Sequence, residues 1–324
     1  MASIQRPSFT NEVMAAMKSL YPIELADHSF DNVGLLQDNI DPVSIGGGSR
    51  GVPRVALLTN DLTTRVAEEA IRKKASVVVT YHPFLFRPIK SVSLEDPQQR
   101  ILLLLAQHNI AVYSPHTAVD AVQGGITDWL AKMLDGHGVE THHSVLKPIT
   151  TSLPQGFDGA GYGRLVKLGH AVNIGRIVKA YAAGLGDLRY VMVAYPKLHS
   201  KTVLRPGEHQ VSTGTPPVSI RSVAICAGSG YSTLKDCDAD LFITGEMSHH
   251  EALRLTMLGK AVLTVFHSNS ERRFLRDVLQ PQLERALRKA GDDGAEVLVS
   301  DEDEDPFEIW DVKDMPRFAC DGKQ

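Results

Sequence analysis

The first half of the chain alternates between short apolar runs and longer stretches with apolar residues at helical spacing. The runs are rich in β-branched residues, as in parallel strands buried on both faces, and fall at 52–61, 76–82 and 110–114. Between them, 63–75 has helical spacing, and 96–109 is expected to be a helix with Asp96 as its N-cap. The pattern predicts consecutive βαβ units with right-handed crossovers.

The alternation stops at 137–160, a stretch rich in Gly, Pro, Ser and Thr, and resumes afterwards. Further strands are expected at 163–168, 188–195, 218–225, 239–246, 261–267 and 295–300. We therefore predict an α/β (α+β) fold with an N-terminal α/β lobe at 1–136, a connection at 137–160 and a C-terminal α/β lobe at 161–324. The tail is expected to pack back on the first lobe, and the acidic run 301–305 to form a solvated turn.

Composition narrows the class of protein. The chain has 324 residues, a formal net charge of −4 and 43% hydrophobic residues. This composition is typical of an ordinary globular protein, and the length indicates two domains or one two-lobed unit. No Lys/Arg-rich face stands out, so no direct nucleic-acid partner is expected. No apolar stretch reaches the roughly 18–20 residues of a membrane span, so no membrane association is expected.

Cysteine usage bears on the compartment. The three cysteines form no CxxC pair and no disulfide framework, which suits a reducing compartment such as the cytoplasm. The N-terminal segment carries Arg6 and Lys18 but also Glu12, so a mitochondrial location stays open, as does the nucleus.

Polar residues at the carboxyl ends of buried strands mark where open α/β sheets bind ligands. Three predicted strands end in this way, on His82, on His116 with Asp120 four residues later, and on His267 with Glu271 four residues later. Imidazole and carboxylate ligands together suit Zn, Fe, Mn, Co or Ni. A histidine that ends a strand is also often a hydrogen-bonded turn residue, so spacing alone leaves both interpretations open.

Two further stretches combine polar residues with turn chemistry. Asp31 and Asn32 precede Gly34, which is equally typical of a plain turn. The stretch 241–253 contains Glu246, His249 and His250 at a strand-to-helix junction, and its plain interpretation is a helix capped by Ser248. The glycine turn "CAGSG" at 226–230 is compatible with a weak anion cradle, but lacks the ending of a Walker loop.

Seven motifs occur in the order found in one known family. They are "FDNVGL", "YHPFLFRPIK", "YSPHTAVDAVQGGITDWLA", "GYGRLV", "AICAGSG", "ADLFITGEMSHHEAL" and "VFHSNSERRFL". From about residue 8 to about 310 the chain resembles the Ngg-interacting-factor-three-like family, some of whose bacterial members are labelled GTP cyclohydrolase 1 type 2. The motifs "GEMSHHE" and "HSNSER" look like its eukaryotic branch.

The resemblance implies a dinuclear metal protein. It implies two intertwined, duplicated α/β lobes with mixed sheets flanked by helices, a metal cleft between them, and homo-oligomers that are often dimer-based hexamers. Carried over by motif, the metal ligands are His82, Asp120, His267 and Glu271, with Glu271 bridging. Tyr81 stands where bacterial members have a ligand histidine, so the resemblance implies one or two divalent metals per chain. His116, Asp31, Asn32 and His249 are expected near the site.

Two functions follow as hypotheses. The first is a metal-dependent hydrolase acting on a nucleotide-like substrate such as GTP, with Glu246 or His250 as acid/base groups. The alternative is a non-catalytic metal-binding scaffold, a metal-handling protein or a partner of a regulatory protein, as the family name suggests.

Overall fold

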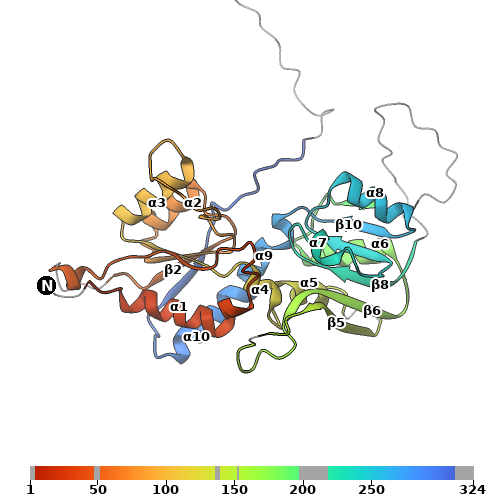
Figure 1. The fold of residues 1–324 in the computed structure, drawn as a ribbon, viewed down its shortest axis with the longest axis horizontal. Helices are drawn as coiled ribbons and strands as arrows, with labels where there is room; N and C mark the ends of the chain where they lie inside the picture. Colours follow the sequence, from red (N-terminus) through yellow and green to blue (C-terminus); the bar gives the residue numbers. More distant parts are fainter. Residues whose placement is uncertain (1–3, 47–51, 136–138, 152, 197–217, 311–324) are drawn as a thin grey trace, which may run out of the picture.

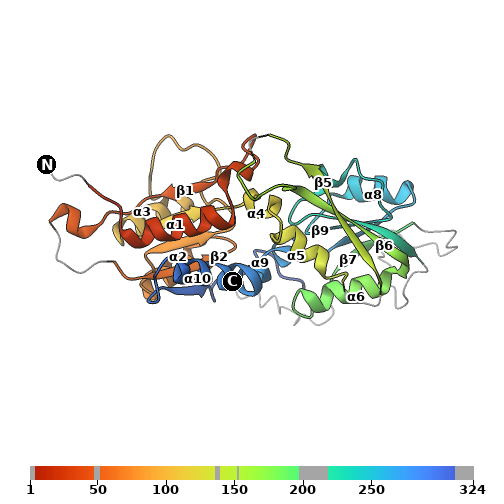
Figure 2. The ribbon, with the colours of Figure 1, turned by 90° about the horizontal axis from the view of Figure 1, so that it is seen from below.

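Two mixed β-sheets lie side by side along the longest axis of the molecule, each flanked by helices (Figures 1 and 2). A computed structural model describes residues 4–46, 52–135, 139–151, 153–196 and 218–310 of the chain. The predicted mixed α/β fold is confirmed. We call the part built on the five-stranded sheet the first lobe and the part built on the six-stranded sheet the second lobe.

The sheet of the first lobe is parallel except at one edge. Only β1 runs antiparallel to its neighbour, and the strand order is β1 (Gly34–Gln37), β4 (Ala111–Ser114), β3 (Val77–Thr80), β2 (Val55–Thr59) and β11 (Glu296–Val299). Helices α1 (Ser8–Leu20) and α10 (Gln280–Lys289) lie below this sheet in Figure 1, and α2 (Thr64–Arg72) and α3 (Pro97–Gln107) lie above it. Asp96 caps α3 by accepting the N–H of Gln99 at 3.0 Å, as predicted.

Alternate residues of the central strands serve the two faces of this sheet. Leu57 and Val78 pack among residues of α2 and α3, whereas Leu58 and Val79 pack in the core that contains α1. All four are fully buried, which explains why these strands have continuous apolar sequences.

The sheet of the second lobe has a parallel centre and antiparallel edges. Its order is β5 (Thr141–Pro148), β6 (Gly161–Asn173), β8 (Ser219–Ile225), β9 (Leu241–Thr244), β10 (Ala261–Thr264) and β7 (Met192–Ala194), and β8, β9 and β10 are parallel. Residues of α5 (Ile126–Lys132) and α6 (Ile174–Gly184) pack on one face, and residues of α7 (Tyr231–Leu234) and α8 (His249–Met257) on the other.

Short elements connect these layers. They are α4 (Thr117–Ala121), α9 (Arg272–Phe274), a π-helical turn at Leu275–Leu279, and 3-10 turns at Ile23–Leu25, Pro42–Ile45 and Ser268–Ser270. Among the described residues, no helix is both long and apolar enough to cross a membrane.

The path of the chain differs from the prediction at one strand. The expected connection at 137–160 is wrong for Thr141–Pro148, which forms β5 and pairs antiparallel with β6. This edge strand has a polar, half-exposed sequence, so it carried no apolar run to mark it. The segment α10–β11 then returns to the first lobe, where β11 pairs with β2 (Figure 1).

The acidic run 301–305 is only in part the solvated turn that its composition predicts, because Asp301 and Glu304 are exposed but Asp303 is not. The side chain of Asp303 is only 2% exposed, because it accepts the backbone N–H of Asn60 at 2.7 Å and lies 3.4 Å from Arg272 Nε. This run therefore fixes the start of the C-terminal tail against both lobes.

Candidate metal centre between the lobes

Parallel strands of both sheets end at the boundary between the lobes, and two strands in each sheet are followed there by a polar residue. In the first lobe, Asp61 follows β2 and His82 follows β3. In the second, Glu246 follows β9 and His267 follows β10, with Glu271 one turn further on. Neighbouring parallel strands thus deliver one carboxylate and one imidazole from each lobe.

Three of these side chains converge on one point. His82 Nε2 lies 3.3 Å from His267 Nε2 and 3.5 Å from Glu271 Oε2. His267 Nε2 lies 3.3 Å from Glu271 Oε1. Within the described part of the chain, His82, His267 and Glu271 are the group of potential ligands gathered in this way. Glu271 is almost fully buried, so its carboxylate needs a partner there.

The opposite nitrogen of each imidazole is held by a carboxylate. His82 Nδ1 donates to Asp61 Oδ1 at 2.9 Å, and His267 Nδ1 lies 3.1 Å from Glu246 Oε1. A proton on Nδ1 leaves the lone pair on Nε2, which then faces Glu271. This arrangement of carboxylate, imidazole and metal position is the one that orients histidine ligands in metalloproteins.

The distances fit a bound transition metal. Metal–ligand bonds of about 2.0–2.1 Å in a tetrahedral arrangement place neighbouring ligand atoms roughly 3.3 Å apart. The three separations in this group are 3.3, 3.3 and 3.5 Å. Three protein ligands also leave a further coordination position open, as catalytic zinc sites do.

Electrostatics at this point favour a cation. The hydrogen bond with Glu271 is the main reason that the pKa of His267 rises to about 9. Burial lowers the pKa of His82, but Asp61 and Glu271 outweigh burial and raise it overall. Burial raises the pKa of Asp61, but the hydrogen bond and charge of His82, together with Asn60 and Arg272, outweigh burial and lower it overall. A metal therefore has to displace protons from this group.

Asp120 lies outside the three-residue group. Its Oδ1 accepts the hydroxyl of Tyr81 at 2.9 Å, and burial raises the pKa of Asp120 to about 7. Burial, and then Asp120, raise the pKa of Tyr81 well above its usual value, so the phenol stays protonated. Tyr81 thus contacts one of the expected ligands, and its ring centroid lies 4.9 Å from that of His82.

His116 has a different partner. Its Nδ1 donates to Asp31 Oδ1 at 2.7 Å, and Thr117 donates its backbone N–H to the other oxygen at 3.2 Å. Burial raises the pKa of Asp31, but these bonds outweigh burial and lower it. His116 holds a left-handed backbone, with φ of 29°, and its ring centroid lies 5.4 Å from that of His82. The side-chain amide of Asn32 donates instead to the carbonyl oxygen of Leu85.

His249 and His250 stay apart from the three-residue group. Both are exposed at the start of α8, with ring centroids 5.3 Å from one another. Ser248 caps this helix in a capping box with Glu251, so the plain interpretation of that stretch is confirmed.

The glycine turn at 226–230 packs against the candidate centre. A Cβ on Gly228 would lie 2.7 Å from Glu271 Oε1 and 3.1 Å from His267 Nε2, and its φ is +55°. The N–H of Gly228 is donated to Ser270 Oγ at 2.9 Å, and that of Gly230 to Thr244 Oγ1 at 2.9 Å. Because the N–H groups of Gly228 and Gly230 already have acceptors, they are not available to bind an anion. The role of Gly228 is to leave room for the side chains of Glu271 and His267.

Sequence reasoning missed several residues around the group. Asp61 holds His82, and the side chain of Asn60 donates to Glu271 Oε2 at 3.1 Å. Asp61 ends a strand just as His82 does, so the same positional signal applied to it. Asp303 and Arg272 gave no local signal, because their contacts join distant parts of the chain.

The fold and the site together define a two-lobed mixed α/β protein with a His/Glu group where the lobes meet. The chain belongs to the Duf34/NIF3 (NGG1p interacting factor 3) family, whose sequence model matches residues 9–306. The family resemblance noted from the motifs is thereby confirmed.

Relatives match along most of their length. The protein NIF3 homolog of Schizosaccharomyces pombe is 39% identical over 306 residues, which cover 94% of this chain and 99% of the relative. NGG1-interacting factor 3 of Saccharomyces cerevisiae is 36% identical and covers 92% and 96%. The crystal structure of a Bacillus cereus protein related to NIF3 matches with a TM-score of 0.70 at 20% identity, over 96% of this chain and all of that chain, which supports the fold alone.

Proposed function

We propose that the protein binds a divalent transition metal through His82, His267 and Glu271 and hydrolyses a nucleotide-like substrate with it. The observation that carries this proposal is the convergence of two Nε2 atoms and one carboxylate at separations of 3.3–3.5 Å. When bound, such a metal supplies Lewis-acid activation of water and of substrate oxygens.

The chain's own residues orient the ligands and handle protons. Asp61 and Glu246 hold the Nδ1 atoms, which keeps both Nε2 lone pairs directed at the metal position. Glu246 is half exposed, and its pKa is lowered chiefly by a hydrogen bond from Ser229, so it is a carboxylate at neutral pH. We assign it the acid–base role in preference to His250, because Glu246 contacts a ligand directly.

The second candidate is a non-catalytic metal-handling or regulatory protein. Its support is the name of the yeast relative, NGG1-interacting factor 3, which describes an interaction with another protein. In this case the metal would stabilise the junction of the two lobes, and a regulatory protein would be the partner.

Turnover separates the two candidates. Metal-loaded protein is assayed against nucleosides, nucleotides and phosphoesters, together with Glu271→Gln and, as a matched control, Glu284→Gln on the surface of α10. A hydrolase predicts a turnover that falls about hundredfold in Glu271→Gln, as loss of a metal-centre partner typically costs, and is kept in Glu284→Gln. Absence of turnover across the panel supports the second candidate.

A further inference from the structure

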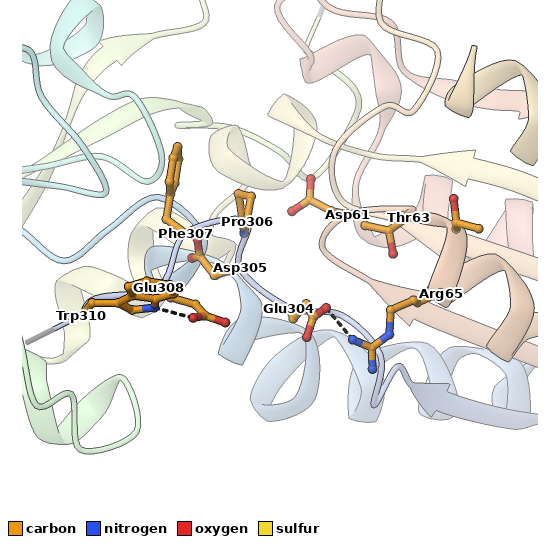
Figure 3. A pocket seen from close by; sticks show the side chains of 10 residues that line it. Asp61, Thr63, Arg65, Glu304, Asp305, Pro306, Phe307, Glu308 and Trp310 are labelled. Carbon is orange, nitrogen blue, oxygen red and sulfur yellow. Dashed lines mark hydrogen bonds and ion pairs between the residues drawn. The ribbon is translucent and has the colours of Figure 1, made fainter. Parts of the chain in front are cut away.

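A cavity of about 770 Å³ adjoins the candidate centre. His82, His267, Asp61 and Glu246 contribute to one side of it, and the C-terminal tail contributes Asp305, Pro306, Phe307 and Ile309 to the other. A larger hollow of about 1220 Å³ lies by the same tail, but it is lined by neither histidine (Figure 3). The smaller cavity is therefore the one through which a ligand reaches the candidate centre.

The tail is fixed in this position by contacts to both lobes. Asp303 accepts a hydrogen bond from the backbone N–H of Asn60 in the first lobe. Asp305 accepts one from the hydroxyl of Ser268, which is next to the ligand His267. Asp305 also accepts the N–H of Phe307 at 3.1 Å. In Figure 3 the ring of Phe307 points away from the pair formed by Arg65 and Glu304. Phe307 nevertheless remains 83% exposed, so within the described structure most of this ring is uncovered.

The lining of the cavity combines aromatic rings with carboxylates. Its rings come from Tyr190, Phe266 and Phe307, and its acidic groups from Asp61, Glu246 and Asp305. Among the described lining residues, none is Lys or Arg. Exposed aromatic rings favour stacking of a flat ring, and carboxylates favour N–H donors. The lack of Lys and Arg side chains in the described lining disfavours phosphate groups.

Two details of the second lobe support a ligand at this place. Phe266 adopts a φ of 70°, a strained conformation for an aromatic residue, directly before the ligand His267. Glu246 uses Oε1 for its contacts with both Ser229 and His267, which leaves Oε2 for a donor on a ligand.

We propose that this cavity binds a flat heteroaromatic amine without phosphate groups, stacked on Phe307 and hydrogen-bonded to Glu246. The inference rests on the proposed function, because it names the substrate class of that same centre. It restricts that class to bases and nucleosides and excludes nucleoside triphosphates such as GTP.

Calorimetric titration of the full chain with guanosine and with GTP tests the proposal, because the two probes share a ring and differ in phosphate charge. In chelator-treated protein, guanosine should bind at least about tenfold more tightly than GTP. Phe307→Ala should lower the affinity for guanosine by about tenfold, as loss of one stacking contact does. Phe86→Ala changes an exposed aromatic residue of the first lobe and should leave this affinity unchanged.

The proposal is overturned if guanosine shows no saturable binding, if GTP binds as tightly as guanosine, or if Phe307→Ala equals the unmodified protein. Metal content measured on the same samples keeps the two proposals apart. Guanosine binding to a protein that takes up no metal contradicts the proposed function alone, whereas metal uptake without guanosine binding contradicts the ligand proposal alone.

Discussion

Gly228 gives the two ligands of the second lobe the space they occupy. A methyl group there would lie 2.7 Å from Glu271 Oε1 and 3.1 Å from His267 Nε2. Gly228→Ala should therefore lower zinc affinity by about tenfold or more, because a displaced ligand costs at least that much. Gly259→Ala is the matched control, since Gly259 has a φ of +79° and open space around it.

Both glycine variants should lose about 1–2 kcal/mol of stability, because L-residues are strained at positive φ. Only Gly228→Ala should lose zinc affinity, as measured by calorimetric titration of the folded proteins. Equal zinc affinity in the two variants would contradict the packing argument.

We propose that Tyr81 sets the number of metals at the centre. Its neutral phenol donates to Asp120 and cannot replace an imidazole as a ligand. We expect one tight metal position at His82, His267 and Glu271, and a weak one at Asp120 and Glu271. Tyr81→His should raise the metal content measured by elemental analysis towards two per chain, whereas Tyr81→Phe, which adds no ligand, should not. A folded Tyr81→His protein with unchanged stoichiometry would argue against this division.

At the scale of elements, Arg54 ties the returning segment to the first lobe. It precedes β2, donates Nε to Asp292 Oδ1 at 2.9 Å, contacts Glu12 of α1, and lies over the ring of Phe9. The Asp292 side chain is only 7% exposed, so Arg54→Met leaves a buried carboxylate without its charged partner. The free energy of unfolding in urea should fall by about 1–3 kcal/mol.

The effect of Arg54→Met should depend on pH. The hydrogen bond from Arg54 is the main reason that the pKa of Asp292 is lowered. A lowered carboxyl pKa stabilises the folded state above the unfolded pKa of about 3.9, and this contribution is lost as the pH falls through the lowered value. The difference between variant and unmodified protein should thus be full at pH 7 and shrink below pH 4.

Arg273→Met is the control for Arg54→Met, because Arg273 and Asp277 form an exposed pair at 2.8 Å. It should change the unfolding free energy by less than about 0.5 kcal/mol. If Arg54→Met and Arg273→Met lower the free energy of unfolding by the same amount at pH 7, the buried contact of Arg54 with Asp292 stabilises the protein no more than an exposed ion pair does.

The elements that sequence predicts well are those whose signal is local. The buried strands β2, β3 and β4 are continuous apolar runs, and Asp96 and Ser248 cap α3 and α8 as expected. The polar edge strand β5 and the pairing of β11 with β2 had no such signal, because partners across the sheet define them.

The candidate site divides in the same way. His82, His267 and Glu271 could be predicted because carboxyl ends of parallel strands meet at one edge. The contact of Asn60 with Asp303 joins residues 243 positions apart, and nothing in an acidic run distinguishes a buried carboxylate from a solvated one. Asp120 shares the positional signal of the strand that ends at His116, but its bond to Tyr81 depends on side-chain geometry.

At the scale of the whole molecule, we propose that the chain forms a homo-oligomer, most simply a dimer-based hexamer, by its family resemblance. Exposed apolar side chains on the first lobe, such as Phe30, Phe86 and Leu94, are compatible with such contacts. Light scattering at micromolar concentration should give a particle several times the chain mass of 35.4 kDa. A 35.4 kDa particle would refute the oligomer.

The metal centre itself is tested most directly by zinc titration of chelator-treated protein, followed by calorimetry. The account predicts at least one tight equivalent per chain, with release of protons from the histidines. Glu271→Ala should lose this binding, whereas His116→Ala, whose histidine is bonded to Asp31 outside the three-residue group, should retain most of it. A folded protein that takes up no Zn, Mn, Fe, Co or Ni, or a Glu271→Ala variant that binds zinc as tightly as the unmodified chain, would contradict the account.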